Sequence, residues 1–153
     1  MSLRPFRIIL SAHQASMRNR LVSHSFAEHN LNAHKFINEF NSLTATLSED
    51  VLVPVTVTPL SSTDPNAYTF KVQTPPIAFL IMRAAGLISH EYPLSAQTFN
   101  KKKGDTRGKV SLKQVYWLAK IKQSDPLYRH FDAKDLVRSI CDVCDALDIQ
   151  VIE

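Results

Sequence analysis

Alternating hydrophobic and polar positions predict three short strands in the first half of the chain. Residues 6–12 form a largely apolar run, and the β-branched residues at 51–60 alternate with other types, which is typical of a half-buried strand. After a turn, residues 68–72 are expected to return as the second strand of a hairpin. Because Pro54 and Pro59 cannot donate backbone hydrogen bonds, the strand at 51–60 is expected to be an edge strand or to contain bulges.

Between the first two strands the hydrophobic positions take a helical period. Phe36, Ile37 and Phe40 fall at i, i+1 and i+4, so they share one face of a helix expected at about 33–41. A shorter helix is expected before it, around Phe26. The first half is therefore predicted to be a small sheet with helices packed on one face.

A Thr-Pro-Pro sequence separates the two halves of the chain. Two successive prolines exclude Thr74 and Pro75 from helical conformation, so we expect a domain boundary at this point. The strand-rich domain then comprises residues 1–73, and helical patterns dominate residues 74–153. The predicted fold class is α+β: an N-terminal small antiparallel sheet with helices, followed by an all-α, three-helix C-terminal domain.

The three C-terminal helices are predicted from their start and stop signals. They are expected at 77–87 with Gly86 near the end, at 111–122 after the N-cap Ser111, and after the N-cap Asp132. A long polar connection at 88–110 separates the first two, and residues 149–152 are compatible with a short terminal strand.

Apolar spacing predicts which faces of the last two helices are buried. The buried stripe of the middle helix is expected to consist of Leu112, Val115, Tyr116 and Ala119, with Lys113, Lys120 and Lys122 off it. The last helix repeats apolar residues at i, i+3 and i+4 spacing, namely Leu136, Val137, Ile140, Cys141, Cys144 and Leu147.

Charge changes this picture mainly in the second domain. Residues 101–122 carry eight basic residues and one acid, whereas residues 123–153 carry three basic residues and seven acids. A basic segment of this kind attracts polyanions, either nucleic acid or an anionic membrane surface. A solvated loop is the alternative explanation for the adjacent lysines Lys101, Lys102 and Lys103.

Composition excludes several classes of protein. With 153 residues and 44% hydrophobic content the chain can form a packed core, and its longest apolar run, residues 77–82, is far shorter than a membrane-spanning helix. Two cysteines cannot supply a disulfide scaffold. All three glycines lie in the second half, which excludes glycine-built phosphate loops and Gly-x-Ser-x-Gly nucleophile turns from the first.

Two motifs that invite a chemical interpretation are better explained without catalysis. Cys141 and Cys144 form a Cys-x-x-Cys, but no second pair completes a zinc site, and both fall on the apolar face of a predicted helix, so core packing is expected. The segment 104–110 lacks the spacing and the hydroxyl residue of a nucleotide-binding loop. Its glycines and basic residues suit a phosphodiester backbone instead. No catalytic residue, metal site or cofactor is predicted.

A series of short motifs keeps the order found in a known family. The C-terminal motifs are Thr-Pro-Pro-Ile-Ala-Phe-Leu at 74–80, Arg-Ala-Ala-Gly-Leu at 83–87, the lysines at 101–103, Gly-Lys-Val-Ser at 108–111 and Ala-Leu-Asp-Ile at 146–149. The N-terminal ones are Ala-His-Gln-Ala at 12–15 and the segment 32–41, which ends Phe-Ile-Asn-Glu-Phe-Asn. On these residues the chain resembles the bacterial-type large-subunit ribosomal protein L11 family over nearly its whole length.

The resemblance implies a non-catalytic, two-domain protein of the large ribosomal subunit. Residues 1–73 would face translation factors near the stalk base, and residues 74–153 would bind rRNA of the GTPase-associated centre. The implied partners are large-subunit rRNA, stalk-base ribosomal proteins and, transiently, translational GTPases, with no membrane and no small-molecule substrate. Carried over position by position, rRNA contacts are expected at Thr74, Pro75, Arg83, Gly86, Lys101, Lys102, Lys103, Arg107, Gly108, Lys109 and Ser111.

Location and an alternative function stay open at this point. Residues 1–27 contain four arginines and no acid, as import segments do, so the mitochondrial matrix and its ribosome are expected, with another organelle or the bacterial cytoplasm as the alternative. The alternative function is a DNA-binding regulator that uses the three-helix domain as a helix-turn-helix. The basic loop and the acidic last helix fit folded RNA better, because helix-turn-helix proteins require a basic recognition helix.

Overall fold

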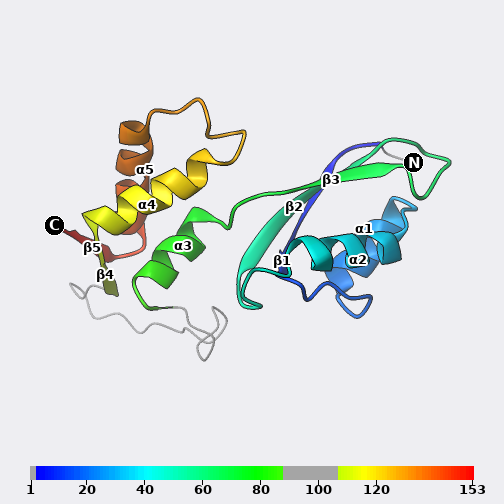
Figure 1. Ribbon diagram of the computed structural model, residues 1–153, viewed down its shortest axis with the longest axis horizontal. Coiled ribbons are helices and arrows are strands. Elements are labelled where there is room, and N and C mark those ends of the chain that lie inside the picture. The colour runs from blue at the N-terminus through cyan, green and yellow to red at the C-terminus, as the bar shows by residue number, and fades with distance from the viewer. Residues whose placement is uncertain (1–2, 88–106) are drawn as a thin grey trace. The chain divides into compact units, whose positions relative to one another are not determined.

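The computed structural model describes residues 3–87 and 107–153, and the chain divides into two compact units (Figure 1). The first unit is Met1–Gln73 and the second is Thr74–Glu153. Each has its own sheet and its own helices.

The first unit is a three-stranded antiparallel sheet with two helices on one face (Figure 1). The strands are β1 (Phe6–Ser11), β2 (Leu52–Pro59) and β3 (Tyr68–Val72). The helices are α1 (Arg20–Glu28) and α2 (Ala33–Leu43), and each begins at an asparagine whose side chain accepts backbone N–H groups of the first turn. The predicted small antiparallel sheet with helices is confirmed.

The prediction that β2 is an edge strand or bulged is wrong, because β2 lies in the centre of the sheet, paired without interruption between β1 and β3. Its prolines are tolerated where hydrogen bonds are not required. Pro54 lies just beyond the last β2–β3 pair, Val55 with Val72, and its carbonyl still accepts the N–H of Gln73 at 2.9 Å. Pro59 is the final residue of the strand. The missing donors therefore fall at the ends of the β2–β3 ladder, where they leave few partners unpaired, although Pro54 lies opposite Ile9 within the β1–β2 ladder.

An aromatic cluster fills the space between the sheet and the helices. The rings of Phe26 and Phe36 lie 4.7 Å apart, and those of Phe36 and Phe40 lie 5.5 Å apart, all three fully buried. The ring of Tyr68 meets Phe26 edge-on, and its hydroxyl donates to the carbonyl of Asn32 at 3.0 Å. Burial, together with the nearby Glu39 carboxylate, raises the pKa of Tyr68 to about 12.

The second unit contains three helices and a small sheet. The helices are α3 (Ile77–Ala84), α4 (Leu112–Gln123) and α5 (Ala133–Ala146). The strands are β4 (Gly108–Ser111) and β5 (Ile149–Ile152), which pair in parallel. The predicted all-α domain is therefore wrong. Four residues are too few to show an alternating pattern, and the partner of β4 lies far away along the chain, so local sequence gave no signal for it.

The buried face of α4 also differs from the prediction. Val115 and Ala119 are buried as expected, whereas Leu112 and Tyr116 are exposed, and Leu118 and Lys122 are buried in their place. At 100° per residue the stripe is rotated by about 60° from the predicted one. Apolar residues occur all around this helix, so their spacing does not define a single face, and packing against α3 and α5 decides it.

Candidate nucleic-acid interface

The C-terminal end of α3 closes in a turn that only glycine adopts easily. The N–H of Leu87 donates to the carbonyl of Met82 at 2.8 Å, and the N–H of Gly86 donates to the carbonyl of Arg83 at 3.0 Å. Gly86 has a φ of +71° in this arrangement, which is a Schellman motif. Gly86 is exposed, and the half-buried Arg83 lies in the last turn of the helix.

The strand β4 begins against this same end of α3. A Cβ atom added at Gly108 would lie 3.2 Å from the Cβ of Ala85, so the glycine permits a close approach. One residue earlier, the N–H of Arg107 donates to the carbonyl of Asp148 at 2.8 Å and extends the contact with β5. The fold therefore gathers Gly86, Arg107, Gly108 and the exposed Lys109 into one region.

Ser111 joins β4 to α4 through a complete capping box. Its hydroxyl accepts the N–H of Gln114 at 3.3 Å, and its own N–H donates to the side-chain oxygen of Gln114 at 2.8 Å. The predicted N-cap is confirmed. The half-buried hydroxyl of Ser111 thus has a structural role in addition to any role in binding.

Thr74 and Pro75 lie at the other end of α3, where a buried polar network fixes the start of the second unit. Lys122 and Asp125 are only 5% and 8% exposed, and their charged groups are 3.5 Å apart. The N–H and the hydroxyl of Thr74 both donate to the Asp125 carboxylate, and the Lys122 ammonium donates to the Thr74 hydroxyl at 2.9 Å. Each charge is therefore compensated by hydrogen bonds in an environment where an unpaired charge would be costly.

Sequence reasoning missed this network. The sequence prediction places Lys122 off the buried stripe and assigns no role to Asp125. The sequence contains only a weak signal for this network. A Lys and an Asp lie three residues apart at a helix end, just before Pro126, and this spacing allows an ion pair that fixes the helix end. The spacing does not predict that the pair is buried.

The described candidate residues form two groups, one at each end of α3. That helix spans eight residues, or about 12 Å at 1.5 Å per residue, so an extended ligand is needed to reach both groups. Lys101, Lys102 and Lys103 lie outside the described residues.

The Cys-x-x-Cys motif lies on the inner side of α5, away from any site of this kind. Cys144 is buried and Cys141 is half-buried, and both are free thiols. Burial is the main cause that raises the pKa of both thiols, that of Cys144 to about 11, with a contribution from nearby Asp145. Thiols that stay protonated at neutral pH are poor nucleophiles and poor metal ligands.

Two other kinds of site are absent from the described ranges, 3–87 and 107–153. No group of three or more His, Cys, Asp or Glu side chains there is placed to hold a metal ion. No helix in those ranges has the length and apolar character needed to cross a membrane.

Residues 73–151 match the family described as "Ribosomal protein L11, RNA binding domain", over nearly the whole second unit. The chain belongs to the ribosomal protein L11 family. The large ribosomal subunit protein uL11m of Schizosaccharomyces pombe is 30% identical over 120 residues, which cover 76% of this chain and 74% of that protein. The large ribosomal subunit protein uL11 of Borreliella burgdorferi (strain ZS7) is 30% identical over 104 residues, 68% of this chain and 65% of that protein.

Family membership settles the broad function. L11 proteins are non-enzymatic structural proteins of the large ribosomal subunit, and the second unit of this one is an rRNA-binding domain. Both groups of candidate residues lie within the part of the chain that matches the RNA-binding domain.

Proposed function

We propose that this L11 protein is a component of a mitochondrial large ribosomal subunit. In this proposal residues 74–153 bind rRNA of the GTPase-associated centre, and residues 1–73 face the translation factors near the stalk base. The observation that carries the proposal is the coincidence of the L11 RNA-binding domain with a separate compact unit of the chain. Stalk-base ribosomal proteins and, transiently, translational GTPases are the proposed protein partners.

The proposed rRNA contacts comprise the two groups at the ends of α3 and the basic segment Lys101–Lys103. Phosphate contacts position a protein on RNA, and exposed lysines and glycine-rich backbone suit such contacts. The exposed Lys109 and Gly86 support the group at the end of α3, and the fixed Thr74 supports the group at its start. The proposed contact residues are Thr74, Pro75, Arg83, Gly86, Lys101, Lys102, Lys103, Arg107, Gly108, Lys109 and Ser111.

Salt dependence of RNA affinity tests the contact residues. The full chain and a variant with Lys101, Lys102, Lys103 and Lys109 changed to Gln would be titrated with a GTPase-centre rRNA fragment between 50 and 200 mM salt. We expect affinity to fall at least tenfold in the variant, and the slope of log affinity against log salt to decrease by about one for each lost phosphate contact.

A matched control changes lysines outside the proposed site. Lys35→Gln and Lys71→Gln alter exposed lysines of the first unit and are expected to leave both affinity and slope nearly unchanged. An equal loss in this control would show nonspecific charge attraction, and equal binding of wild-type protein to duplex DNA of the same length would contradict the rRNA proposal.

Ser111 allows a sharper test, because its structural and binding roles can be separated. Ser111→Asp keeps a good N-cap and adds a negative charge. If Ser111 lies against a phosphate, this variant loses RNA affinity while its melting temperature stays close to that of wild type. Unchanged affinity would limit Ser111 to the capping box.

The mitochondrial location is proposed on two supports. One relative is named as a mitochondrial protein, and residues 1–27 carry four arginines and no acid. The bacterial relative is equally similar, so a direct test is required. In lysates fractionated by organelle, the tagged protein is expected to sediment with mitochondrial large subunits, and sedimentation with another ribosome would contradict this location.

A further inference from the structure

The outer face of α4 is unusual for a solvent-exposed helix, because it is apolar and basic with no acid. Leu112, Tyr116, Trp117 and Ile121 are all exposed, Trp117 by 65%. The helix contains no Asp or Glu, and two of its three lysines, Lys113 and Lys120, are exposed, whereas Lys122 is buried in the ion pair with Asp125. An exposed helix face is normally polar with charges of both signs, so this face has the composition of a binding surface.

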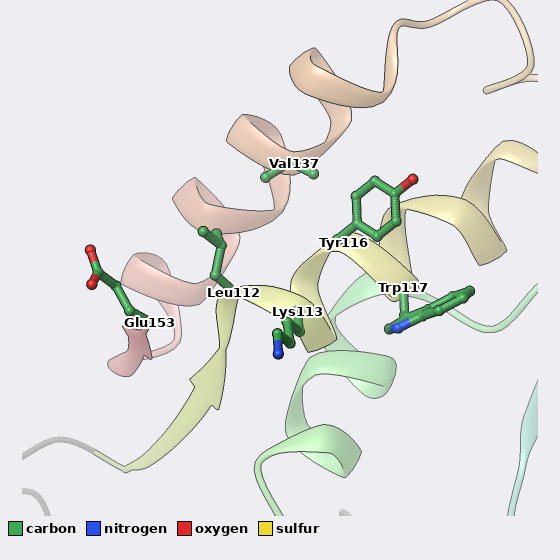
Figure 2. A pocket seen from close by; sticks show the side chains of 6 residues that line it. All are labelled: Leu112, Lys113, Tyr116, Trp117, Val137 and Glu153. Atoms are coloured by element: carbon green, nitrogen blue, oxygen red, sulfur yellow. The ribbon is translucent and has the colours of Figure 1, made fainter.

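The exposed apolar side chains border a groove between α4 and α5. Figure 2 shows Tyr116 and Leu112 extending from α4 towards Val137 of α5, with Trp117 and Lys113 on the neighbouring side of α4. The groove has a volume of about 570 Å³, and Glu153 lines the part of it that is farther from Tyr116 and Trp117 (Figure 2). An opening of this size accommodates one flat aromatic group with room to spare.

Lysines occupy the rim of this surface. Lys113 lies one helical turn before Trp117, and the Lys120 ammonium lies 5.5 Å from the centre of the Tyr116 ring. The rings of Tyr116 and Trp117 meet at 69° with centres 6.1 Å apart, so they present differently oriented faces to a ligand. Aromatic rings alternating with cations are suited to a strand with stacking bases and anionic phosphates.

We propose that this α4 face, defined by Lys113, Tyr116, Trp117 and Lys120, is a second RNA contact that binds an unpaired nucleotide. The base stacks on Trp117 beside the groove, and Lys113 and Lys120 contact the flanking phosphates. The acid Glu153 repels phosphates from the far end and so orients the strand towards the lysines. The inference rests on the proposed rRNA-binding function and adds a site outside the contacts proposed for α3 and β4.

RNA is favoured over a protein partner by charge and by continuity. The face begins directly after Lys109 and Ser111, where rRNA contacts are already proposed, and α4 carries its two exposed lysines, Lys113 and Lys120, without any Asp or Glu. Sequence-specific RNA recognition commonly uses unpaired bases stacked on exposed aromatic side chains. An apolar peptide would use the groove floor and would gain little from the lysine rim.

Trp117 is the only tryptophan of the chain, so its fluorescence reports on this face alone. The full chain would be titrated with the GTPase-centre rRNA fragment while tryptophan emission and RNA affinity are measured together. Stacking is expected to quench most of the emission at saturation. Trp117→Ala is expected to weaken binding by about 5- to 100-fold, the effect of removing one stacked base, and Trp117→Phe to recover most of the loss.

Phe131→Ala provides a matched control, because Phe131 is also an exposed aromatic residue of the second unit but lies in the connection between α4 and α5. This variant is expected to bind RNA like wild type. Circular dichroism melting of each variant checks folding, and the high exposure of Trp117 predicts little change.

The outcomes distinguish this inference from the proposed function. If wild-type protein does not bind the fragment, the proposed function fails. If it binds and the lysine variant at 101–103 and 109 loses affinity while Trp117→Ala binds normally, the function stands and the stacking site is overturned. The site is also overturned if RNA quenches the emission of the wild type but Trp117→Ala binds with unchanged affinity. The base would then lie near the ring without contributing to binding.

Discussion

The two units differ in how many of their described aromatic residues are buried. In the first unit Phe26, Phe36 and Phe40 are fully buried around the sheet, whereas in the second Tyr116, Trp117 and Phe131 are exposed. The second unit buries the ring of Phe79 together with aliphatic side chains and an ion pair, Lys122 with Asp125. Aromatic area stabilises the first unit, whereas in the second the rings of Tyr116, Trp117 and Phe131 are available to a ligand.

This difference affects how each unit holds its shape. The first unit is stabilised by the burial and close packing of large aromatic rings. The hydrophobic effect that drives this packing has no preferred direction. The second fixes its starting residue, Thr74, by directional hydrogen bonds to charged groups. Such bonds set a position accurately and contribute modest net stability, because burying the charges is costly. Damage to the two units should therefore have different consequences for binding.

The largest effect is expected from the aromatic core. Phe36→Ala removes a fully buried ring, and should lower the free energy of unfolding of the first unit by about 4 kcal/mol. Hydrogen exchange followed peptide by peptide would show faster exchange in β1–β3 and unchanged exchange in α3–α5. Faster exchange throughout would mean that the two units unfold together and would weaken the comparison.

A somewhat smaller effect is expected from the ion pair, and it should reach RNA binding. Asp125→Ala leaves the Lys122 ammonium buried without its counter-charge, which should destabilise the second unit by about 3 kcal/mol and weaken rRNA binding through Thr74. The measurements are urea unfolding followed by Trp117 fluorescence, and RNA affinity.

The double variant Lys122→Met with Asp125→Leu is the control for that experiment. Replacing both charges removes the burial penalty along with the pairing, so stability should recover while RNA affinity stays low. Recovery of affinity as well would show that the network stabilises the unit without positioning Thr74.

The smallest effect concerns Tyr68 and alkaline pH. Its pKa is raised from 10.0 to about 12 in the folded protein, because burial and Glu39 disfavour the phenolate. The stability that this shift contributes is fully present below pH 10 and is lost as the pH rises towards 12. Between pH 8, 10 and 11 the melting temperature should therefore fall more steeply for wild type than for Tyr68→Phe. An equal fall in both proteins would contradict the raised pKa.

Local patterns predicted the first unit better than the second. The hairpin and the Phe36–Phe40 helix face follow from periods that lie within a few residues, and the structure confirms them. The strand β4 and the Thr74–Asp125 contact depend on partners far along the chain, which no local pattern reveals.

The two errors about strand position and helix face have the same origin. The central position of β2 and the burial of Lys122 were both decided by neighbouring elements against local preference. For the candidate site, the family resemblance supplied the residues, and the structure supplied their division between the two ends of α3. The structure also exposes Tyr116 of the α4 face, which periodicity assigns to the core.

The glycines at 86 and 108 constrain the evolution of this domain in different ways. Gly86 has open space around the missing Cβ, but its positive φ is one that L-residues rarely adopt. A substitution at a neighbouring residue therefore cannot relieve the strain of replacing this glycine. Gly108 lacks only room, and the obstacle is the single methyl group of Ala85. Across L11 sequences position 86 should therefore rarely change, and its changes should not correlate with those at other positions. At positions 85 and 108 we expect correlated changes, with alanine at 108 where 85 is glycine.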